Sequence, residues 1–584
     1  MWSWEGRSAT AMASWTPPVP RIVCLTGILP RTLRLDRMGG SEPEQRRRGG
    51  GAWRRSVTAP SQKTGRPQLS LCVTDPTCDL GTPLTRTREQ IVTHRHSTAV
   101  TAASFLLLSG VALTAAPAAF AGAPGGTYAG DRNSDFDGDG YDDVLTGAPG
   151  GTDGGRKGAG YVTVQYGAAS GMGTATSIPR VRTAVFGQAT AGVPGSAEAG
   201  DGFGTAVATG DLDADGYDDA IVAAPGEDEG SMSDAGRVTV LYGSRAGLTP
   251  ARSVTLGSAA PAADARFGLA IAAARLSGAT PGDVLAVADR AGASLFTYGA
   301  GSLEGTDRLD TAGRNSMQPA SLTTGNYDGD AYADLLVTGS SLEEDYRPRS
   351  SLYMGAADGP AYTRSLGGGS ATASGDIDND GYDDLVYGKP DKPEDENEPL
   401  TGGSVGVYLG SEDGMDNVDE LGTPTQVWTQ YTAGVPGTAE LGDGFGADVS
   451  LADVDGDGYA DLAVGVPGED VGTVADAGGV RILRGSAAGL TAAGAKSFDQ
   501  SSAGVPGTAE KGDRWGGQVR LADTDSDGRS ELLAAAPGEN TDDGVVWCLA
   551  ASTNGTVSTG SWSYGGGSLG ASGIDARFGT SIDE

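Results

Sequence analysis

Short apolar runs that end at glycine and proline recur along most of the chain. Runs of this length, bounded by Gly and Pro, are typical of β-strands. In most units a further strand alternates in character, as in Arg237–Tyr242 and Val405–Leu409. The pattern therefore predicts an all-β chain of repeated hairpins. The clearest runs, each followed by Gly/Ala-x-Pro, are Val144-Leu145, Ala220–Val222, Leu385–Tyr387 and Leu462–Val464.

A nine-residue acidic loop precedes each of these runs, with carboxylates at positions 1, 3, 5 and 9 and glycine at position 6. Calcium takes roughly six to eight oxygen ligands, and alternate side chains with a carbonyl at position 7 supply them if the chain turns at the glycine. The complete copies are Asp135, Asp137, Asp139, Tyr141 and Asp143; Asp211, Asp213, Asp215, Tyr217 and Asp219; Asp376, Asp378, Asp380, Tyr382 and Asp384; and Asp453, Asp455, Asp457, Tyr459 and Asp461.

Two further copies depart from the pattern. Asp523, Asp525, Asp527, Arg529 and Glu531 form a fifth loop with Glu at position 9. Asn326–Asp334 is a weaker sixth, because Asn replaces the first carboxylate and Ala replaces the glycine. We expect Ca²⁺ at about five sites, with a sixth possible at Asn326–Asp334. The alternative for each loop is a solvated turn without an ion, although crowded carboxylates repel one another unless a cation neutralises them.

These loops are not EF-hands. An EF-hand requires a bidentate Glu at position 12 and flanking helices. Position 12 is Thr146, Val222, Tyr387 or Val464 in the complete copies, and apolar strand-like runs follow. We therefore expect each ion in a hairpin loop between two strands.

The loops start at residues 135, 211, 326, 376, 453 and 523, and the long second interval hides one more unit. Phe267-Gly268 and Asp283–Val287 match that unit, but Arg275, Ser277 and Ala279 stand in place of its carboxylates. This copy is expected to keep the fold and to lose the metal. Seven units of about four strands each predict a seven-bladed β-propeller.

Most units begin with Phe-Gly, which we expect to open a strand, and the first ends its apolar run in Gly147-Ala148-Pro149. Together with the acidic loops, these motifs resemble the FG-GAP repeats of the integrin α-subunit amino-terminal propeller. The resemblance covers most of residues 125–584. It implies a seven-bladed propeller, calcium in hairpins at the blade edge and partner binding through loops of the opposite face.

The first unit lacks a Phe-Gly before its loop, whereas Phe578-Gly579 stands near the carboxyl end. We predict that this tail supplies the strand missing from the first blade, which removes open sheet edges. The alternative is a truncated eighth unit.

Three segments share an A-G-V-P-G-S/T-A-E-x-G-D signature: Ala191–Asp201, Ala433–Asp443 and Ala503–Asp513. We predict that they are loops of fixed shape between blades. The alternative is that they form part of a binding surface.

The first 121 residues differ in composition from the rest, because they hold both His and three of the four Cys. A basic segment, the apolar stretch Ala99–Leu113 and Ala119-Phe120-Ala121 match a secretory signal. We expect a disordered or mis-annotated extension at 1–91, a signal peptide at 92–121 and the propeller at 122–584. The alternative is a genuine disordered extension with an internal membrane anchor.

The net charge of −35 argues against nucleic acid or anionic membranes as partners. No membrane span is expected after signal cleavage, and the predicted mature chain has no His for Ser-His-Asp or Cys-His catalysis. Cys548 is predicted to be buried. The favoured function is a secreted, monomeric module that binds extracellular protein or glycan, with association to the cell surface as the alternative location. The alternative is an exported hydrolase or lyase with an active site at the propeller axis. Convergent carboxylates with a Tyr or Arg at the axis would favour this enzyme. An axis lined with small residues would favour the binding module.

Overall fold

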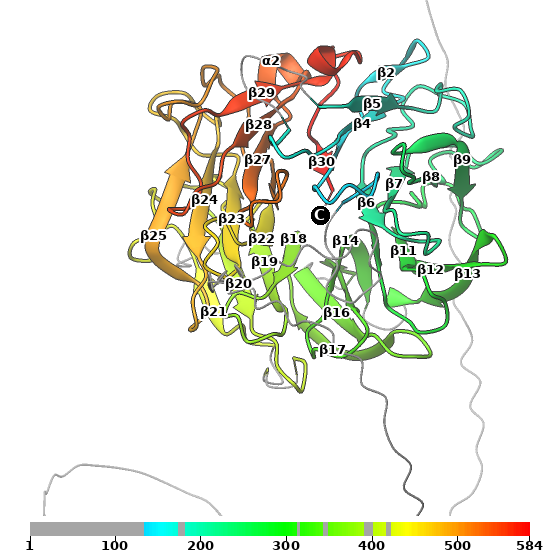
Figure 1. The fold of residues 1–584 in the computed structure, drawn as a ribbon, viewed down its shortest axis with the longest axis horizontal. Helices are drawn as coiled ribbons and strands as arrows, with labels where there is room; N and C mark the ends of the chain where they lie inside the picture. The colour runs from blue at the N-terminus through cyan, green and yellow to red at the C-terminus, as the bar shows by residue number, and fades with distance from the viewer. Residues whose placement is uncertain are drawn as a thin grey trace, which may run out of the picture. The chain divides into compact units, whose positions relative to one another are not determined.

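The computed structural model describes residues 134–172, 181–311, 316–342, 348–390, 401–415, 418 and 422–583. These residues form seven four-stranded antiparallel sheets around a common centre (Figure 1). The prediction of a seven-bladed β-propeller is therefore confirmed. The extension expected at 1–91 and the signal peptide expected at 92–121 lie outside the described residues.

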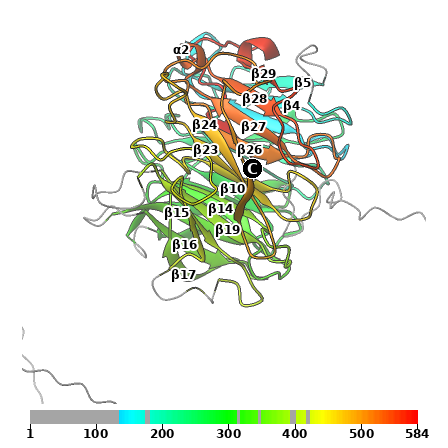
Figure 2. The ribbon, with the colours of Figure 1, turned by 90° about the vertical axis from the view of Figure 1, so that its left-hand side faces the viewer.

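In six blades the four strands follow one another in chain order from the axis outward. Figure 2 shows the same ring turned by 90°. The second blade consists of β6 (Val207–Gly210), β7 (Asp219–Ala224), β8 (Arg237–Tyr242) and β9 (Thr249–Leu256). The third consists of β10 (Ile271–Ala274), β11 (Val284–Asp289), β12 (Gly292–Gly299) and β13 (Ser302–Leu309). The fourth consists of β14 (Met317–Gly325), β15 (Asp334–Ser341), β16 (Pro348–Met354) and β17 (Ala361–Gly367).

Blades five to seven have the same order. The fifth blade consists of β18 (Ala371–Gly375), β19 (Asp384–Lys389), β20 (Ser404–Tyr408) and β21 (Gln426–Trp428). The sixth consists of β22 (Val449–Ala452), β23 (Asp461–Val466), β24 (Gly479–Arg484) and β25 (Thr491–Phe498). The seventh consists of β26 (Gln518–Ala522), β27 (Glu531–Ala536), β28 (Val545–Leu549) and β29 (Trp562–Tyr564).

The first blade is assembled from both ends of the described chain, in the order β30 (Ser581–Ile582), β1 (Val144–Ala148), β4 (Tyr161–Gln165) and β5 (Thr183–Phe186). A small hairpin, β2 (Thr152–Asp153) and β3 (Arg156–Lys157), projects from it. Two four-residue helical turns, α2 (Glu539–Asp542) and η1 (Gly566–Leu569), also lie among the described residues.

The strands are apolar because most of them are buried on both faces. Every residue of β7, β11, β23 and β27 is buried, since each sheet packs between its two neighbours in the ring. The alternating pattern predicted for the third strand does not lead to one exposed face: β20 is buried throughout and β8 at five of six positions. Among the strands of the seven blades, only the outer strand β13 exposes most of its residues.

The Phe-Gly pairs lie just before the first strand of a blade and do not open it, which corrects the sequence prediction. Phe203 is fully buried, and its N–H donates to the carbonyl of Ala159 at 2.8 Å. Gly204 has φ +89°, a conformation that extended strands do not use, and a Cβ there would lie 2.8 Å from the carbonyl oxygen of Tyr161. The pair thus anchors the entering chain between two blades.

The ring closes through the carboxyl-terminal segment. In β30, Ser581 and Ile582 pair with Gly147 and Thr146 of β1, and the N–H of Gly579 donates to the carbonyl of Gly147 at 3.0 Å. Figure 1 shows this red segment beside the cyan strands of the first blade. The prediction that the tail completes the first blade is confirmed, and the truncated eighth unit is not observed among the described residues.

The three segments with the repeated signature connect consecutive blades in one shape. In each, the Asp carboxylate at the end accepts a hydrogen bond from the N–H of the Glu three residues earlier at 2.6 Å. The prediction of loops with a fixed shape is therefore confirmed. The three pairs are Glu198 and Asp201, Glu440 and Asp443, and Glu510 and Asp513.

Candidate metal centres

The five acidic loops lie on one face of the ring. Four of them connect the first strand of a blade to the second, and the loop that starts at Asp135 leads into β1. The residue at position 9 begins the second strand in four blades, as Asp219 begins β7. Because equivalent turns of every blade emerge at the same end, the sheet topology places all five loops together.

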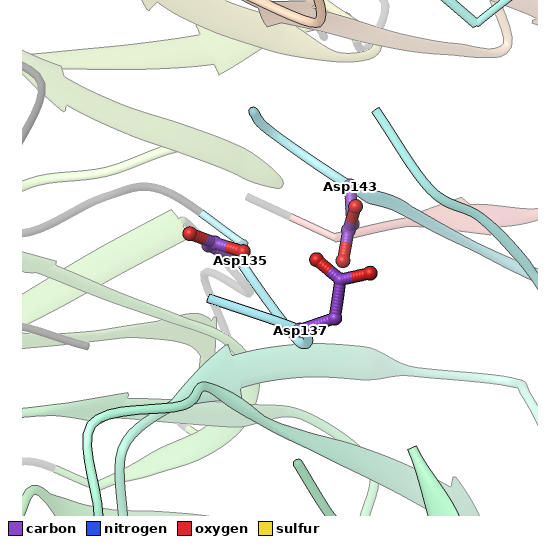
Figure 3. Close-up of side chains that lie close together, drawn as sticks. All are labelled: Asp135, Asp137 and Asp143. Carbon is purple, nitrogen blue, oxygen red and sulfur yellow. The ribbon is translucent and has the colours of Figure 1, made fainter. Parts of the chain in front are cut away.

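Three carboxylates converge in each loop. Asp135, Asp137 and Asp143 each offer an oxygen within 4.8 Å of the others, and their side chains point toward one another in Figure 3. The same geometry recurs at positions 1, 3 and 9 of the other four loops. These trios are Asp211, Asp213 and Asp219; Asp376, Asp378 and Asp384; Asp453, Asp455 and Asp461; and Asp523, Asp525 and Glu531.

The carboxylate at position 1 fixes the turn. Asp135 accepts hydrogen bonds from the N–H groups of Asp139 at 3.1 Å and Gly140 at 2.8 Å. Gly140 has φ +88°, which explains the glycine at position 6. Asp211, Asp376, Asp453 and Asp523 accept the equivalent pair of main-chain hydrogen bonds.

The carboxylate at position 9 is buried and ties three parts of the blade together. Asp143 accepts hydrogen bonds from the N–H of Phe136 at 2.9 Å and of Gly167 at 2.8 Å. Gly167 follows the third strand, so this side chain links the loop to the end of β4. Asp219, Asp384 and Asp461 repeat both bonds.

The carboxylate at position 3 has an acceptor that the protein does not use. In all five loops its Oδ1 atom is buried and has no hydrogen-bond partner. A buried acceptor left unsatisfied costs about 1–3 kcal/mol, and its repetition at the same position of five loops is the pattern that a cation-binding loop would have. The five residues are Asp137, Asp213, Asp378, Asp455 and Asp525.

Burial makes these carboxylates reluctant to ionise without a counter-ion. Desolvation, and to a smaller extent the neighbouring carboxylates, raise the pKa of Asp384 to about 8 and those of Asp461 and Glu531 to about 7. The pKa values of Asp143 and Asp219 are raised for the same reason. A cation among these groups would relieve both the desolvation and the mutual repulsion.

Positions 5 and 7 are placed differently from positions 1, 3 and 9. Asp380 and Asp457 accept hydrogen bonds from the N–H groups of Tyr382 and Tyr459 at 3.1 Å. The carboxylates at position 5, which are Asp139, Asp215, Asp380, Asp457 and Asp527, are not part of the converging trios. Position 7 is Tyr141, Tyr217, Tyr382, Tyr459 or Arg529, and the Arg529 side chain pairs with Asp527.

The two degenerate loops keep the turn without a carboxylate trio. Asn326 donates from Nδ2 to the carbonyl of Asp330 at 3.0 Å, and its buried Oδ1 has no partner. In the third blade Ser277 replaces the carboxylate at position 3, and its hydroxyl accepts a hydrogen bond from the N–H of Ala279 at 3.0 Å.

The donor set fits calcium. It consists of oxygen atoms only, which hard cations such as Ca²⁺ prefer, and each loop leaves one buried oxygen without a protein donor. The residues at positions 1, 3 and 9 would hold the ion, and the ion would supply the positive charge that lets the loop carboxylates lie together.

Sequence reasoning missed the arginines that contact three of the loops. Arg182 donates to Asp137 at 2.8 Å and lies over the ring of Tyr166, whereas Arg252 pairs with Asp213 and lies over Tyr242. In the sixth blade Arg484 pairs with Asp455 directly. One sequence position could have pointed to these arginines. Tyr166, Tyr242 and Arg484 occupy the same place in their blades, directly before the glycine whose N–H donates to the carboxylate at position 9.

A cavity of about 210 Å³ lies on the axis of the ring, lined mainly by small side chains of the innermost strands. Examples are Ala208, Ala273, Thr323, Ala373 and Ser450. Three charged side chains, Asp218, Asp283 and Arg520, also line this cavity. Arg520 pairs with Asp583, and Asp218 accepts a hydrogen bond from the N–H of Asp135 at 2.9 Å. Small side chains therefore make up most of the lining at the axis, with a few charged groups among them.

Two other sequence predictions concern burial and membranes. Cys548 is buried, as expected, and desolvation raises the pKa of its thiol, so it is a poor nucleophile at neutral pH. Across the described residues, the helices are too short and too polar to traverse a bilayer.

Comparison with known proteins agrees with this architecture. The FG-GAP repeat model matches residues 133–164, 203–241, 368–408, 445–483 and 515–549. The chain is similar to Integrin alpha-PS5 of Drosophila melanogaster, with 35% identity over 107 residues, which are 18% of this chain and 9% of that protein. It is also similar to Integrin alpha-PS3 of the same organism, with 29% identity over 154 residues, 24% of this chain and 12% of that protein.

The chain thus aligns with only about a tenth of the length of these curated relatives. The five matched segments are the five blades whose acidic loops bring three carboxylates together, and the third and fourth blades, with degenerate loops, are not matched. The chain is therefore a protein of five FG-GAP repeats within a seven-bladed propeller that resembles the integrin α subunit.

Proposed function

We propose that this protein is a secreted, calcium-stabilised interaction module that binds an extracellular protein or glycan through its propeller. The observation that supports this most is the set of five carboxylate trios on one face, each with a buried oxygen that lacks a donor. Extracellular calcium modules bind at roughly 10⁻⁴ to 10⁻³ M, so export would place these loops where the ion is plentiful. The ion stabilises the blades and leaves the opposite face for a partner.

The opposite face carries the loops between blades, and one of them exposes two large side chains. Tyr431 is 60% exposed and Leu441 is 66% exposed, and both lie between β21 and β22. The carboxylate of Asp443 fixes the end of this loop through the N–H of Glu440. An exposed aromatic and an exposed aliphatic residue on a loop of fixed shape are suited to anchor a partner.

The axial cavity supports binding over catalysis at the same place. Its lining is dominated by small residues, and its one arginine, Arg520, already has a buried carboxylate partner. We therefore propose a monomeric module without catalytic activity and not a hydrolase or lyase. The mature propeller would span residues 122–584.

A binding screen tests this function. The full chain, loaded with calcium, is applied to arrays of extracellular proteins and glycans, and each hit is repeated in the presence of chelator. The Tyr431→Ala and Leu441→Ser double variant should lose at least tenfold in affinity for a true ligand. Arg245, exposed in the β8–β9 loop on the metal-loop face, provides the control, because Arg245→Ser should bind like the parent. A ligand that binds the double variant equally well would exclude this loop as the contact surface.

A further inference from the structure

The connection between the second and third blades is shorter than the three connections that carry the repeated signature. In each signature connection, sixteen residues separate the outer strand of one blade from the Phe or Trp of the next, namely residues 187–202, 429–444 and 499–514. Only ten residues, 257–266, separate β9 from Phe267. The connection into the third blade is therefore six residues shorter, and it has no Gly-Val-Pro-Gly segment.

In the second, sixth and seventh blades the signature connection covers the outer part of the blade that follows it. Its second residue is a Gln whose Nε2 donates to a Glu just after the second strand, in the pairs Gln188 and Glu227, Gln430 and Glu469, and Gln500 and Glu539. Its glycine lies against the outer strand. Ser253 of β9 donates to the carbonyl of Gly192 at 3.0 Å, and Ser561 beside β29 donates to that of Gly504 at 2.8 Å.

The proline of the signature is held by a side chain of the third strand. Arg481 of β24 donates from Nε to the carbonyl of Pro436 at 3.1 Å, and Trp547 of β28 donates from Nε1 to that of Pro506 at 2.8 Å. Different side chains thus bind the same carbonyl in two blades. The signature segment is therefore seated on three surfaces: the turn after the second strand, the third strand and the outer strand.

The third blade has a cavity of about 780 Å³ at these same surfaces. Arg481 and Trp547 pair with the fourth residue of the second strand of their blades, and in the third blade that position belongs to Ser294, which pairs with Val287. Ser294 lines the cavity, together with the β11–β12 turn at residues 289–291 and residues 305–308 of β13. The cavity therefore lies where a signature segment lies in the other three blades.

The outer strand of the third blade is correspondingly uncovered, at the rim of the ring (Figure 1). Six of the eight residues of β13 are exposed, against two of eight in β9 and three of eight in β25. Those two strands belong to blades that a signature connection covers. The exposure of β13 thus supports, independently of the cavity, that the third blade lacks a covering segment.

The walls of the cavity favour a segment with small, uncharged side chains. Alanines of the short connection, such as Ala260 and Ala263, form one side. The charged residues that line the cavity are two Asp and two Arg, so their charges balance: Asp289, Arg290, Asp307 and Arg308. A segment rich in glycine, alanine and proline matches such walls, and proline reduces the conformational freedom that a segment loses on binding.

Arg308 is placed to bind a main-chain carbonyl of that segment. Its Nη1 atom donates to the Ser294 hydroxyl at 2.8 Å, so the guanidinium lies beside the position that Arg481 and Trp547 occupy in their blades. Asp289, whose side chain is only 5% exposed, holds the guanidinium through Nη2 at 2.7 and 2.8 Å. The Arg308 side chain remains 40% exposed and faces the cavity with a charged donor group.

We propose that this cavity binds a short segment of an extracellular partner protein, composed of small residues and proline, in the way that the other blades bind the chain's own Gly-Val-Pro-Gly segments. The segment would lie along β13 and accept a hydrogen bond from Arg308. This site rests on the proposed function and deepens it, because it gives the partner a chemistry. It is separate from the loop that carries Tyr431 and Leu441.

The probe is the peptide Ala-Gly-Val-Pro-Gly-Thr-Ala, which is the sequence of residues 433–439 and again of residues 503–509. Its ends are blocked so that it carries no charge, and a fluorescent label reports its anisotropy. Anisotropy should rise when the full chain is added. A peptide with the same residues in scrambled order should bind at least tenfold more weakly.

A matched pair of variants locates the binding. Ala291→Trp fills the cavity from the exposed β11–β12 turn and should weaken peptide binding at least tenfold. Ala246→Trp makes the same change at an exposed position of the β8–β9 loop, outside the cavity, and should bind like the parent. The Tyr431→Ala and Leu441→Ser double variant should also bind the peptide like the parent. Far-ultraviolet circular dichroism confirms that each variant folds.

A loop exchange gives a second, independent test. Residues 257–266 are replaced by the sequence of residues 499–514, so that the third blade acquires a signature connection of its own. The new segment should occupy the cavity from within the chain, and the added peptide should no longer bind. Retention of the parent's Tm shows that the exchanged chain is folded.

The proposal is overturned if the peptide does not bind the parent, or if it binds Ala291→Trp as tightly as the parent. It is also overturned if Ala291→Trp abolishes binding of a glycan with which the peptide does not compete, because the cavity would then hold a sugar. The proposed function fails separately. A ligand from the arrays that depends on Tyr431 and Leu441 would keep that function even if the peptide did not bind.

Discussion

Arg484 and Asp455 form an ion pair inside the acidic loop of the sixth blade, and the same guanidinium lies 3.2 Å from Asp461. A positive side chain therefore contacts two of the three carboxylates that would bind calcium. In the fifth blade the equivalent residue is Leu409, which also precedes a glycine bonded to position 9.

The first prediction concerns this arginine. Arg484→Gln removes a positive charge that repels an incoming ion, so calcium affinity at this loop should rise about tenfold, equivalent to roughly 1.4 kcal/mol. Isothermal titration of calcium into the chain measures the change. Leu409→Gln places the same residue at the same position of the fifth blade and should leave the titration unaltered. Equal affinities for Arg484→Gln and the parent would show that the arginine does not compete with the ion.

The second prediction concerns removal of calcium. At about 2 mM Ca²⁺ and a Kd of roughly 10⁻⁴ to 10⁻³ M, each loop contributes about 0.7 to 1.8 kcal/mol to the free energy of unfolding. Chelator should therefore lower Tm by several degrees in a calorimetric scan. An identical melting curve with and without chelator would rule out calcium in the loops.

The third prediction assigns the metal to individual residues. Asp455→Ala removes the unpartnered acceptor at position 3 and should reduce bound calcium by about one per chain. Ser277→Ala changes the same position of the third blade, where no carboxylate trio exists, and should not change the metal content. Atomic absorption after dialysis gives both values.

The fourth prediction is a pH dependence. Burial raises the pKa of Asp384 to about 8 and that of Asp461 to about 7, so in the calcium-free chain the folded state binds protons more tightly than the unfolded state. Calcium-free protein should therefore gain stability as pH falls from about 8 toward 5. Protons and calcium compete for these carboxylates, so the rise in Tm that calcium produces should be larger at pH 8 than at pH 5. The reverse order would contradict this linkage.

The fifth prediction tests the closure of the ring. Arg520 of β26 and Asp583 after β30 form a buried ion pair, and Asp583 also accepts a hydrogen bond from the N–H of Leu145 at 2.9 Å. Asp583→Asn leaves a buried guanidinium without its counter-charge and should lower the free energy of unfolding by about 3–5 kcal/mol. Denaturant titration measures it.

The control for this variant is an ion pair that is exposed. Lys157 and Asp575 lie 2.8 Å apart, and their side chains are 73% and 44% exposed. Lys157→Gln should therefore change the free energy of unfolding by less than about 1 kcal/mol. If the two variants lose the same stability, the closing pair has no special role.

Much of the fold could be predicted because the same short sequence motifs recur from unit to unit. The acidic loops, the apolar runs and the Gly-Pro ends each have a local physical cause, and seven units left few alternatives to a ring. The closing strand could be predicted because the first unit lacked its Phe-Gly and Phe578-Gly579 remained unused. The same local reasoning wrongly predicted that Phe-Gly opens a strand. The left-handed conformation of Gly204 could not be predicted in this way, because it depends on close packing against the neighbouring blade.

Contacts between distant residues could not be predicted in this way. Arg252 reaches Asp213 only because β9 folds back over the loop, and nothing near either residue indicates the pairing. The Gln–Glu pairs are a partial exception. Gln188 and Glu227, Gln430 and Glu469, and Gln500 and Glu539 are each separated by 39 residues, a constant spacing that is visible in the sequence.

The strand that completes the first blade also determines when the protein can finish folding. Leu145 and Asp583 are bonded across 438 residues of chain, so the blade that leaves the ribosome first waits for a partner made after all the others. Contacts this distant in sequence are slow to form, and the unpaired edge of β1 stays available to other chains meanwhile. Any fragment that stops before Ser581 keeps that edge permanently, and we expect such fragments to pair with one another and to aggregate.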